Sequence, residues 1–287
     1  MTDIPTPLVS ADWLAQHLGD RDLVIVDCRF SLAEPELGHQ KYLASHIPGA
    51  FYLHLERDLS SPVGKRGGRH PLPHPDELAK KLSAIGITTS KTFVVAYDDS
   101  KFAFSARVWW LLRYLGHDRV AILDGGLTHW LARGYPVTTE LPQPRPGQFQ
   151  ARPRSESAID LEQLKASKDS PKVLLVDSRD GDRYRGEREP IDPVAGSIPG
   201  SVNLPWKTVT SDDGLARSPQ FQRQLWQDFD DTEEVIVYCG SGVTACVNIL
   251  SRHIAELQPA KLYNGGWSEW CRVENSIQTF LDGIESD

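Results

Sequence analysis

The sequence contains one set of segments twice, and this internal duplication limits the possible folds more than any other feature. Four segments of the first half recur in the second half in the same order. The matched pairs are Leu23–Arg29 with Val173–Arg179, His46–Ala50 with Ser197–Ser201, Phe93–Asp98 with Glu234–Cys239, and Asp124–Trp130 with Asn264–Trp270. A repeated order of this kind indicates two copies of one domain. The 287 residues are enough for two domains, each with its own core.

The stretch between the two copies, Thr138–Arg154, is rich in proline and poor in apolar residues. Such a composition is typical of an extended, exposed linker. We therefore predict a first domain over residues 1–140, a linker over 141–154 and a second domain over 155–287. Residues Gln148–Ala151 are expected to enter the second domain as its first strand.

Short apolar runs alternate with helical patterns in both copies. The runs expected as buried parallel strands are 23–26, 93–97 and 120–123, with their counterparts 173–176, 235–238 and 261–263. Pro75–Ala84 begins with proline and acidic residues, as helices do. Val108, Leu111, Leu112 and Leu115 follow helical spacing. We expect the α/β class, with each domain a mainly parallel sheet covered by helices on both faces. Ligands on such sheets bind at the carboxyl ends of the strands.

One cysteine stands where such a sheet places its chemistry. Cys239 ends an apolar run and is followed by Gly240-Ser241-Gly242-Val243-Thr244-Ala245, after which a helical pattern begins. The two glycines allow a tight bend that turns several N–H groups toward one point, and the helix N-terminus adds positive charge there. Both effects favour a thiolate, so Cys239 is the candidate nucleophile. The first copy carries Asp98 at the matching position, which predicts a catalytically silent first domain.

The other cysteines have simpler interpretations. Cys246 is expected in the helix core, Cys28 is matched by Ser178, and Cys271 has no chemical partners around it. Four scattered cysteines without C-x-x-C spacing favour neither a disulfide framework nor a zinc site, so we expect no metal, no cofactor and a cytoplasmic setting.

Charge and hydropathy exclude several partner classes. The net charge of -8 disfavours nucleic acid, and no apolar run is long enough to span a membrane. The first residues lack a basic stretch followed by an apolar block, so a secretory signal is not expected. An anionic substrate would therefore need cations gathered locally, against the field of the whole chain.

These motifs carry a family resemblance. The paired Asp-x-Arg strand ends, the two Ile-Pro-Gly segments, the two Gly-Gly…Trp segments and the loop from Cys239 to Ala245 resemble the tandem-domain rhodanese family of sulfurtransferases over nearly the whole chain. The loop is similar to that of 3-mercaptopyruvate sulfurtransferases. The resemblance implies two tandem rhodanese-like domains. It also implies a reaction in which Cys239 takes sulfane sulfur from a small anionic donor, forms a persulfide and passes the sulfur to a thiol or cyanide.

The resemblance also implies roles for particular residues. Ser241 would assist Cys239 in catalysis, together with a first-domain histidine at the position of His70 and an acid at Glu56 or Asp58. Arg183 matches the family's first substrate-binding arginine. The second arginine usually follows a Glu-Pro pair, but here Ile191 stands in its place, and Arg188 is the substitute. The remaining loop residues expected at the substrate are Gly240, Gly242, Val243, Thr244 and Ala245.

The basic cluster and the loop bear on the choice of donor. Arg179, Arg183, Arg185 and Arg188 lie close together in an acidic chain, and Arg179 is expected to pair with Asp177 as Arg29 pairs with Asp27. Residues 240–245 carry no charge, which favours the singly charged 3-mercaptopyruvate over the dianion thiosulfate. Thiosulfate remains the alternative donor.

Three other functions are weaker alternatives. A phosphatase of this fold needs an arginine where Ala245 stands. A non-catalytic sulfur-carrier module fits the first domain but not the complete second loop. A cysteine hydrolase needs a positioned histidine, and His253 is expected on the buried face of the following helix.

Overall fold

The computed structural model describes residues 7–143, 145–229 and 232–273, and within them the two copies form two five-stranded sheets. The strands of the first sheet are β1 (Leu8–Val9), β2 (Leu23–Asp27), β3 (Ala50–Tyr52), β4 (Phe93–Tyr97) and β5 (Val120–Leu123). The strands of the second are β6 (Ala158–Ile159), β7 (Val173–Asp177), β8 (Val202–Asn203), β9 (Glu234–Tyr238) and β10 (Lys261–Tyr263). All strand pairs in both sheets are parallel, as predicted.

Both sheets have the same strand order. The first is β1-β5-β4-β2-β3 and the second is β6-β10-β9-β7-β8, so each strand has a counterpart in the other copy. β4 and β2 pair in register from Leu23 opposite Phe93, and β9 and β7 do so from Val173 opposite Glu234. The duplication visible in the sequence is therefore a duplication of topology.

Helices cover both faces of each sheet, which explains why the central strands are apolar on both sides. The α-helices are α1 (Ala11–Gln16), α2 (Leu37–Ala44), α3 (Pro75–Ala84), α4 (Ser105–Tyr114), α5 (Gly126–Ala132), α6 (Leu161–Ser167), α7 (Gly181–Tyr184), α8 (Pro219–Trp226) and α9 (Ala245–Ile254). Short 3-10 turns lie at Ser155–Ser157, Trp206–Val209 and Gln227–Phe229. In β2, Val24 and Val26 face α3 and α4, while Ile25 faces α1 and α5.

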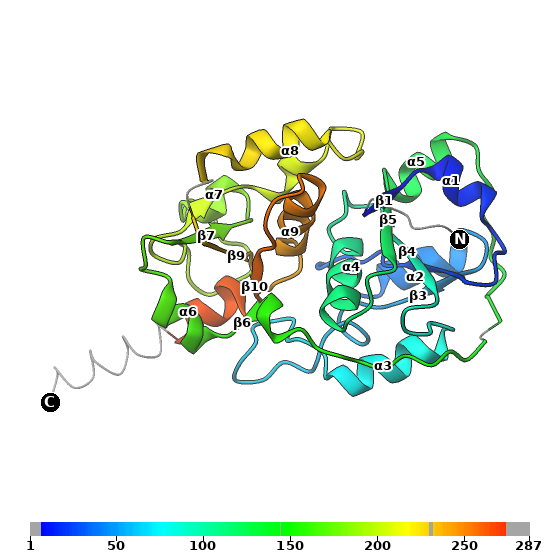
Figure 1. Cartoon of the computed structure of the whole chain (residues 1–287), viewed down its shortest axis with the longest axis horizontal. Coiled ribbons are helices and arrows are strands. Elements are labelled where there is room, and N and C mark those ends of the chain that lie inside the picture. Colours follow the sequence, from blue (N-terminus) through cyan, green and yellow to red (C-terminus); the bar gives the residue numbers. More distant parts are fainter. Residues whose placement is uncertain (1–6, 144, 230–231, 274–287) are drawn as a thin grey trace, which may run out of the picture.

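The two domains share one hydrophobic cluster. Residues of α4 and of α9 belong to the same buried cluster, and the two helices lie side by side in the middle of the molecule (Figure 1). The α4 face predicted from Val108, Leu111 and Leu112 is buried, and so is every other residue of the helix from Ser105 to Trp110. Contacts with the second domain come from Arg107 and Trp109. The interface therefore fixes the first domain beside the amino end of α9, where the loop after Cys239 lies.

The segment before β6 packs on the first domain, not on the second sheet. The backbone N–H of Gln148 donates to Thr88 Oγ1 at 3.1 Å, and the backbone N–H of Thr89 donates to the Gln148 carbonyl at 3.1 Å. The prediction that Gln148–Ala151 begins the second sheet is therefore wrong, because these residues are bound by the first domain and β6 takes that place. The limits of the linker at 141 and 154 stay a proposal.

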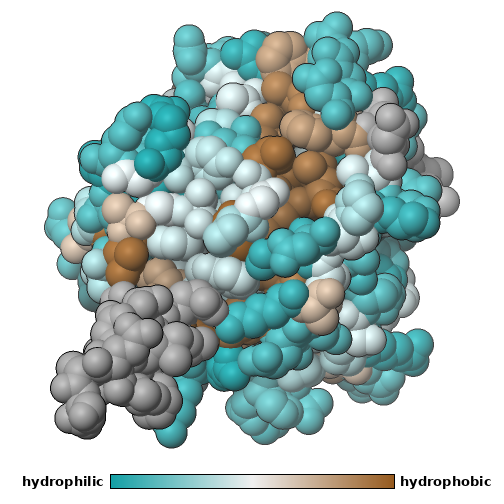
Figure 2. All heavy atoms as spheres, turned by 90° about the vertical axis from the view of Figure 1, so that its left-hand side faces the viewer, coloured by the Kyte–Doolittle hydropathy of each residue, from teal (hydrophilic) through white to brown (hydrophobic). Residues whose placement is uncertain are grey.

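The outer side of the second domain is mainly polar. Figure 2 shows this side with hydrophilic residues around its rim, residues of intermediate hydropathy at its centre, a strip of hydrophobic residues in the upper half and a smaller hydrophobic patch near the left edge. Among the described helices, none is both long enough and apolar enough to cross a membrane.

Candidate active site

Cys239 lies directly after β9 at the carboxyl edge of the second sheet, as predicted. Its carbonyl accepts a hydrogen bond from the Trp267 N–H at 2.8 Å, and the Gly240 carbonyl accepts one from the Ser268 N–H at 2.9 Å. These bonds tie the catalytic loop, residues 240–244, to the turn after β10. The Cys239 side chain is 2% exposed. The cysteine is therefore held on a rigid element, with solvent access restricted to one side.

Gly242 is required by the close packing of this loop. Its φ is +74°, in the left-handed region that other residues rarely adopt. A Cβ atom at this position would lie 2.6 Å from the carbonyl oxygen of Asn264. The glycine predicted from the sequence thus lets two backbone segments approach each other behind Cys239.

The matching loop of the first domain binds a buried negative charge, the carboxylate of Asp98, with its backbone N–H groups. Asp98 is buried, and its Oδ1 accepts hydrogen bonds from the N–H groups of Ser100 at 2.8 Å and Phe102 at 3.2 Å. Its Oδ2 accepts from the N–H groups of Phe104 at 3.0 Å and Ser105 at 2.8 Å, and from the Ser105 hydroxyl at 2.8 Å. Burial raises the pKa of Asp98, and these donors oppose that rise. A loop between a strand and a helix N-terminus can therefore hold a buried anion with its own N–H groups.

A cavity of about 480 Å³ opens beside Cys239, between the two domains. The loop residues Gly240, Ser241, Val243 and Thr244 line it, whereas Gly242 and Ala245 do not. The first domain contributes the apolar side chains of Phe30, Leu32, Leu37, Ala103 and Phe104. Two exposed apolar residues, Leu32 and Ile191, lie at this cavity from opposite domains. The first domain therefore forms one wall of the cavity.

Arg179 has a structural role, as the matched positions predicted. Its guanidinium pairs with Asp177 at 2.6 Å, and Arg29 pairs with Asp27 at 2.7 Å in the other copy. Both pairs are buried. Arg179 also contacts Glu189 at 3.3 Å, so the second-domain pair extends toward the cavity.

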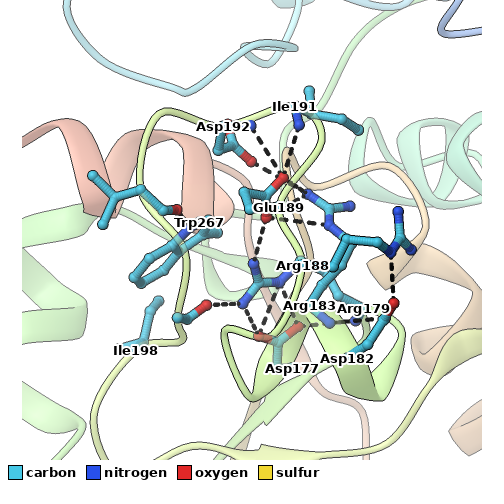
Figure 3. Close-up of polar contacts among 12 residues, drawn as sticks. Asp177, Arg179, Asp182, Arg183, Arg188, Glu189, Ile191, Asp192, Ile198 and Trp267 are labelled. Atoms are coloured by element: carbon cyan, nitrogen blue, oxygen red, sulfur yellow. Dashed lines mark hydrogen bonds and ion pairs between the residues drawn. The ribbon is translucent and has the colours of Figure 1, made fainter.

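Arg183 reaches the cavity wall but does not stand alone there. Its Nη2 donates to Glu189 Oε1 at 2.7 Å and lies 3.4 Å from Asp192 Oδ2. Figure 3 shows Arg179 and Arg183 converging on the Glu189 carboxylate. Asp192 also pairs with Arg69 from the first domain. The local excess of positive charge expected from Arg179 to Arg188 is therefore wrong, because these arginines are paired with carboxylates. At the cavity, Arg179 and Arg183, joined by Arg69, face the buried carboxylates of Asp177, Glu189 and Asp192.

Arg185 and Arg188 lie outside the cavity. Arg188 Nε donates to Asp182 at 2.6 Å and Arg185 Nε donates to Glu187 at 2.7 Å, and both side chains are more than half exposed. In Figure 3 Arg188 turns away from Glu189 toward Asp182. The sequence prediction gave Arg188 the role of the family's second substrate-binding arginine. Its position outside the cavity does not fit that role.

Arg69 takes the place that sequence reasoning gave to Arg188. A Cβ atom built on Gly240 would lie 2.8 Å from Arg69 Nη2 and 3.7 Å from Arg183 Nη2, so both guanidinium groups face the catalytic loop. The backbone N–H of Arg69 donates to Ser268 Oγ at 3.1 Å across the domain boundary. The available signal was its position immediately before His70, but the contact itself depends on how the domains pack.

His70 is buried and contacts Ser241. Its Nδ1 lies 2.7 Å from Ser241 Oγ, although the two residues belong to different domains. Burial lowers the pKa of His70 to about 3, and the neighbouring charges of Arg107 and Arg69 act in the same direction. The imidazole is therefore neutral at pH 7 and can take up a proton only transiently. His70 stands behind Ser241 rather than on the cavity wall.

The acids expected near His70 lie elsewhere. Asp58 accepts a hydrogen bond from the His54 N–H at 2.8 Å and pairs with Lys81 at 2.9 Å. Glu56 is exposed. Within the described residues, no carboxylate contacts the His70 ring, which corrects the expectation of a Glu56 or Asp58 partner.

The other candidates lie away from the cavity. Cys246 is fully buried in α9, and burial raises its pKa to about 12; burial also raises the pKa values of Cys28 and Cys271. His253 is exposed and lies beside Trp109, with ring centroids 5.5 Å apart, so its predicted burial is wrong. No group of three or more potential metal ligands occurs among the residues that the structure describes.

Comparison with known proteins agrees with the duplicated fold. The family described as "Rhodanese-like domain" matches residues 10–133 and again residues 160–273. The chain belongs to the rhodanese family. This confirms the predicted resemblance and the tandem α/β fold. The family matches leave the boundaries at 140 and 155 as our proposal.

Relatives of this rhodanese chain extend over nearly its whole length. A probable 3-mercaptopyruvate sulfurtransferase of Pseudomonas aeruginosa is 46% identical over 271 residues, covering 92% of this chain and 94% of that one. The human 3-mercaptopyruvate sulfurtransferase is 35% identical over 278 residues, covering 92% and 91%. A putative thiosulfate sulfurtransferase of Mycobacterium tuberculosis is 39% identical over 267 residues, covering 92% and 93%.

A solved structure shows the same arrangement. The 3-mercaptopyruvate sulfurtransferase from Leishmania major superposes with a TM-score of 0.83 and 29% identity, covering 95% of this chain and 76% of that one. The predicted reaction class is therefore confirmed: this rhodanese is a sulfurtransferase.

Proposed function

We propose that this protein takes its sulfur from 3-mercaptopyruvate and carries it as a persulfide on Cys239 to a small thiol or to cyanide. One observation carries the proposal. Cys239 opens into a cavity where Arg69 and Arg183 face an uncharged catalytic loop. A cavity with this arrangement suits a small molecule that has a carboxylate at one end and a sulfur atom at the other.

The two arginines would bind the donor carboxylate. Both guanidinium groups lie over Gly240, so a carboxylate between them is next to the sulfur of Cys239. Arginine binds carboxylates with two parallel N–H donors, which orients a planar donor. Arg69 replaces Arg188 in this proposal, and Arg183 keeps the role expected for it.

The balance of charge favours the singly charged donor. Glu189 and Asp192 are buried and already neutralise much of the charge of Arg69 and Arg183. A dianion would need additional cations close by, and the loop from Gly240 to Thr244 supplies none. Thiosulfate is the second candidate donor, since the relative from Mycobacterium tuberculosis carries that name.

The first step moves one sulfur atom and one electron pair. The Cys239 thiolate attacks the thiol sulfur of the donor, so a sulfur–sulfur bond forms while the donor's carbon–sulfur bond breaks. The electron pair of the broken bond leaves with pyruvate as its enolate. The proton of the donor thiol ends on the methyl carbon of pyruvate. Cys239 is left as a persulfide, whose outer sulfur carries negative charge.

His70 and Ser241 are placed to move that proton. The neutral His70 ring can accept a proton, and Ser241 Oγ at 2.7 Å connects the ring to the cavity. The histidine thus acts through the serine hydroxyl, while the serine contacts the reacting atoms.

The second step returns Cys239 to its thiolate. A thiolate or cyanide attacks the outer sulfur of the persulfide, forming a bond to that sulfur and breaking the sulfur–sulfur bond to Cys239. The loop N–H groups stabilise the negative sulfur before transfer, as the first-domain loop stabilises Asp98. A cytoplasmic location stays a prediction.

A comparison of donors tests this assignment. Purified protein is supplied with 3-mercaptopyruvate or thiosulfate at several concentrations, with cyanide as acceptor, and thiocyanate is measured. We expect a higher kcat/KM for 3-mercaptopyruvate. A higher kcat/KM for thiosulfate would overturn the proposal that 3-mercaptopyruvate is the donor. It would not contradict the proposal that Cys239 carries the sulfur as a persulfide.

A further inference from the structure

Arg107 is a buried cation that the proposed mechanism does not use. It belongs to α4 of the silent domain, and its side chain is completely shielded from solvent. The guanidinium crosses the domain interface. Its Nη1 donates to the Gly242 carbonyl at 3.1 Å and to Asn264 Oδ1 at 2.6 Å, and its Nη2 donates to the His70 carbonyl at 3.4 Å. It therefore touches the catalytic loop and the segment that carries His70.

No carboxylate of the described residues is paired with Arg107. The cavity arginines Arg69 and Arg183 pair with Glu189 and Asp192, but the hydrogen bonds of Arg107 in the described part of the chain end on carbonyl and amide oxygens and on the Cys246 thiol. Its Nε is buried without a partner. A buried ion without a counter-ion is costly, and burial lowers the pKa of Arg107 accordingly. A negative charge nearby would offset the free-energy cost of burying this cation.

Two thiol groups interact with the charge of Arg107: that of Cys246, which is also hydrogen-bonded to it, and more weakly that of Cys239. Cys246 stays protonated because burial raises its pKa to about 12. Cys239 is the sulfur that becomes negative, first as a thiolate and then as a persulfide. Arg69 with His70, from the segment before α3, and Arg183 from α7 also face Cys239. The remaining charged residues of the cavity lining are paired with one another or with Asp177: Lys41 with Asp99, Lys207 with Asp180, and Arg179 with Asp177.

We propose that Arg107 is a positioning residue whose charge stabilises the negative sulfur of Cys239 across the domain interface. The arginines at the cavity wall bind the donor, and their charge is shared with carboxylates. Arg107 lies behind the loop and donates a hydrogen bond to the Gly242 carbonyl. Because no carboxylate of the described residues neutralises its charge, that charge can stabilise the negative sulfur of Cys239. The silent domain therefore supplies the counter-charge of the nucleophile, in addition to one wall of the cavity.

The test measures how readily Cys239 ionises and needs no sulfur donor, so its result is independent of the donor assignment. The rate of alkylation of Cys239 by iodoacetamide is followed from pH 5 to 10, with mass spectrometry to locate the label. Two neutral variants are compared with wild type: Arg107→Met, and Arg107→Gln, which can still donate hydrogen bonds. Arg113→Met is the matched control, because it removes a cation near the other end of the same helix, where Arg113 lies over Trp109.

Both neutral variants should raise the pH midpoint of alkylation by about one unit or more, the usual effect of removing an opposite charge at close range. The control should keep the wild-type midpoint. A folded neutral variant with the wild-type midpoint would overturn the proposal, because removing a nearby positive charge raises the pKa of a thiol whose thiolate that charge stabilises. If neither neutral variant folds, Arg107→Lys decides. It keeps the charge and should stay near the wild-type midpoint, and a full-unit rise in that variant would contradict the proposal.

Discussion

His70 and Ser241 come from different domains, yet His70 Nδ1 lies 2.7 Å from Ser241 Oγ behind the catalytic loop. Neither domain alone could form this pair. The first domain has Asp98 where the second has Cys239, yet in the proposed mechanism it takes part in the reaction, because it places a neutral imidazole next to the loop of the other copy.

Removing this pair should slow the first half-reaction. In Ser241→Ala and in His70→Ala, we expect kcat with 3-mercaptopyruvate to fall about 100-fold, within the usual contribution of general acid–base groups. The KM should change little, because neither side chain binds the carboxylate. The rate of pyruvate release in a single-turnover stopped-flow experiment measures this step. A normal rate in both variants would exclude the proposed proton path.

The two cavity arginines should control donor affinity. Arg69→Met and Arg183→Met are each expected to raise the KM for 3-mercaptopyruvate by about 10-fold or more, since a hydrogen bond to a charged group contributes about 1.5–3 kcal/mol. Arg188→Met serves as the control, because Arg188 lies outside the cavity and pairs with Asp182. Steady-state kinetics decide the matter, and an effect confined to Arg188→Met would restore the role first expected for it.

The buried histidine should make folding stability depend on pH. The pKa of His70 is about 3 in the folded chain, far below the value of about 6.5 in an unfolded one. The unfolded chain therefore binds the extra proton first, and stability is lost as pH falls from about 6.5 toward 3. Urea unfolding at pH 7 and pH 5 should show a smaller loss for His70→Asn than for wild type. An equal loss in both would show that other groups dominate.

Gly242 should be intolerant of a side chain. In Gly242→Ala, the new methyl group would meet the Asn264 carbonyl at 2.6 Å in addition to the strain of a positive φ. Gly200→Ala is the matched control, because Gly200 also has a positive φ but nothing lies within 4 Å of its Cβ position. The control should cost only about 1–2 kcal/mol of unfolding free energy. Gly242→Ala should cost more and reduce activity, and equal costs would argue against the close contact.

The features that could be predicted were those determined by residues close together in the sequence. The β-branched runs around Val24 and Val235 fixed the strands, and the glycines after Cys239 indicated a loop at the carboxyl edge of a sheet. Asp98 at the matched position predicts a catalytically silent first domain, and this stays a prediction.

The parts that escaped prediction depend on contacts between distant segments. Arg69 could not be ranked above Arg188, because its place over Gly240 arises from the docking of two domains. The carboxylates of Glu189 and Asp192 were visible in the sequence, but their pairing with the arginines was not. Local spacing determines secondary structure, whereas charge balance in a cleft is a property of the folded whole.

The central claim is that Cys239 carries the transferred sulfur. Protein incubated with 3-mercaptopyruvate and no acceptor is weighed intact by mass spectrometry, and the label is then located by peptide mapping. Wild type should gain the mass of one sulfur atom on Cys239 and lose it when cyanide is added. Cys28→Ser should behave as wild type, since Ser178 fills the matched position of the other copy, while Cys239→Ser should gain nothing. One added sulfur atom and full turnover in Cys239→Ser would contradict the account.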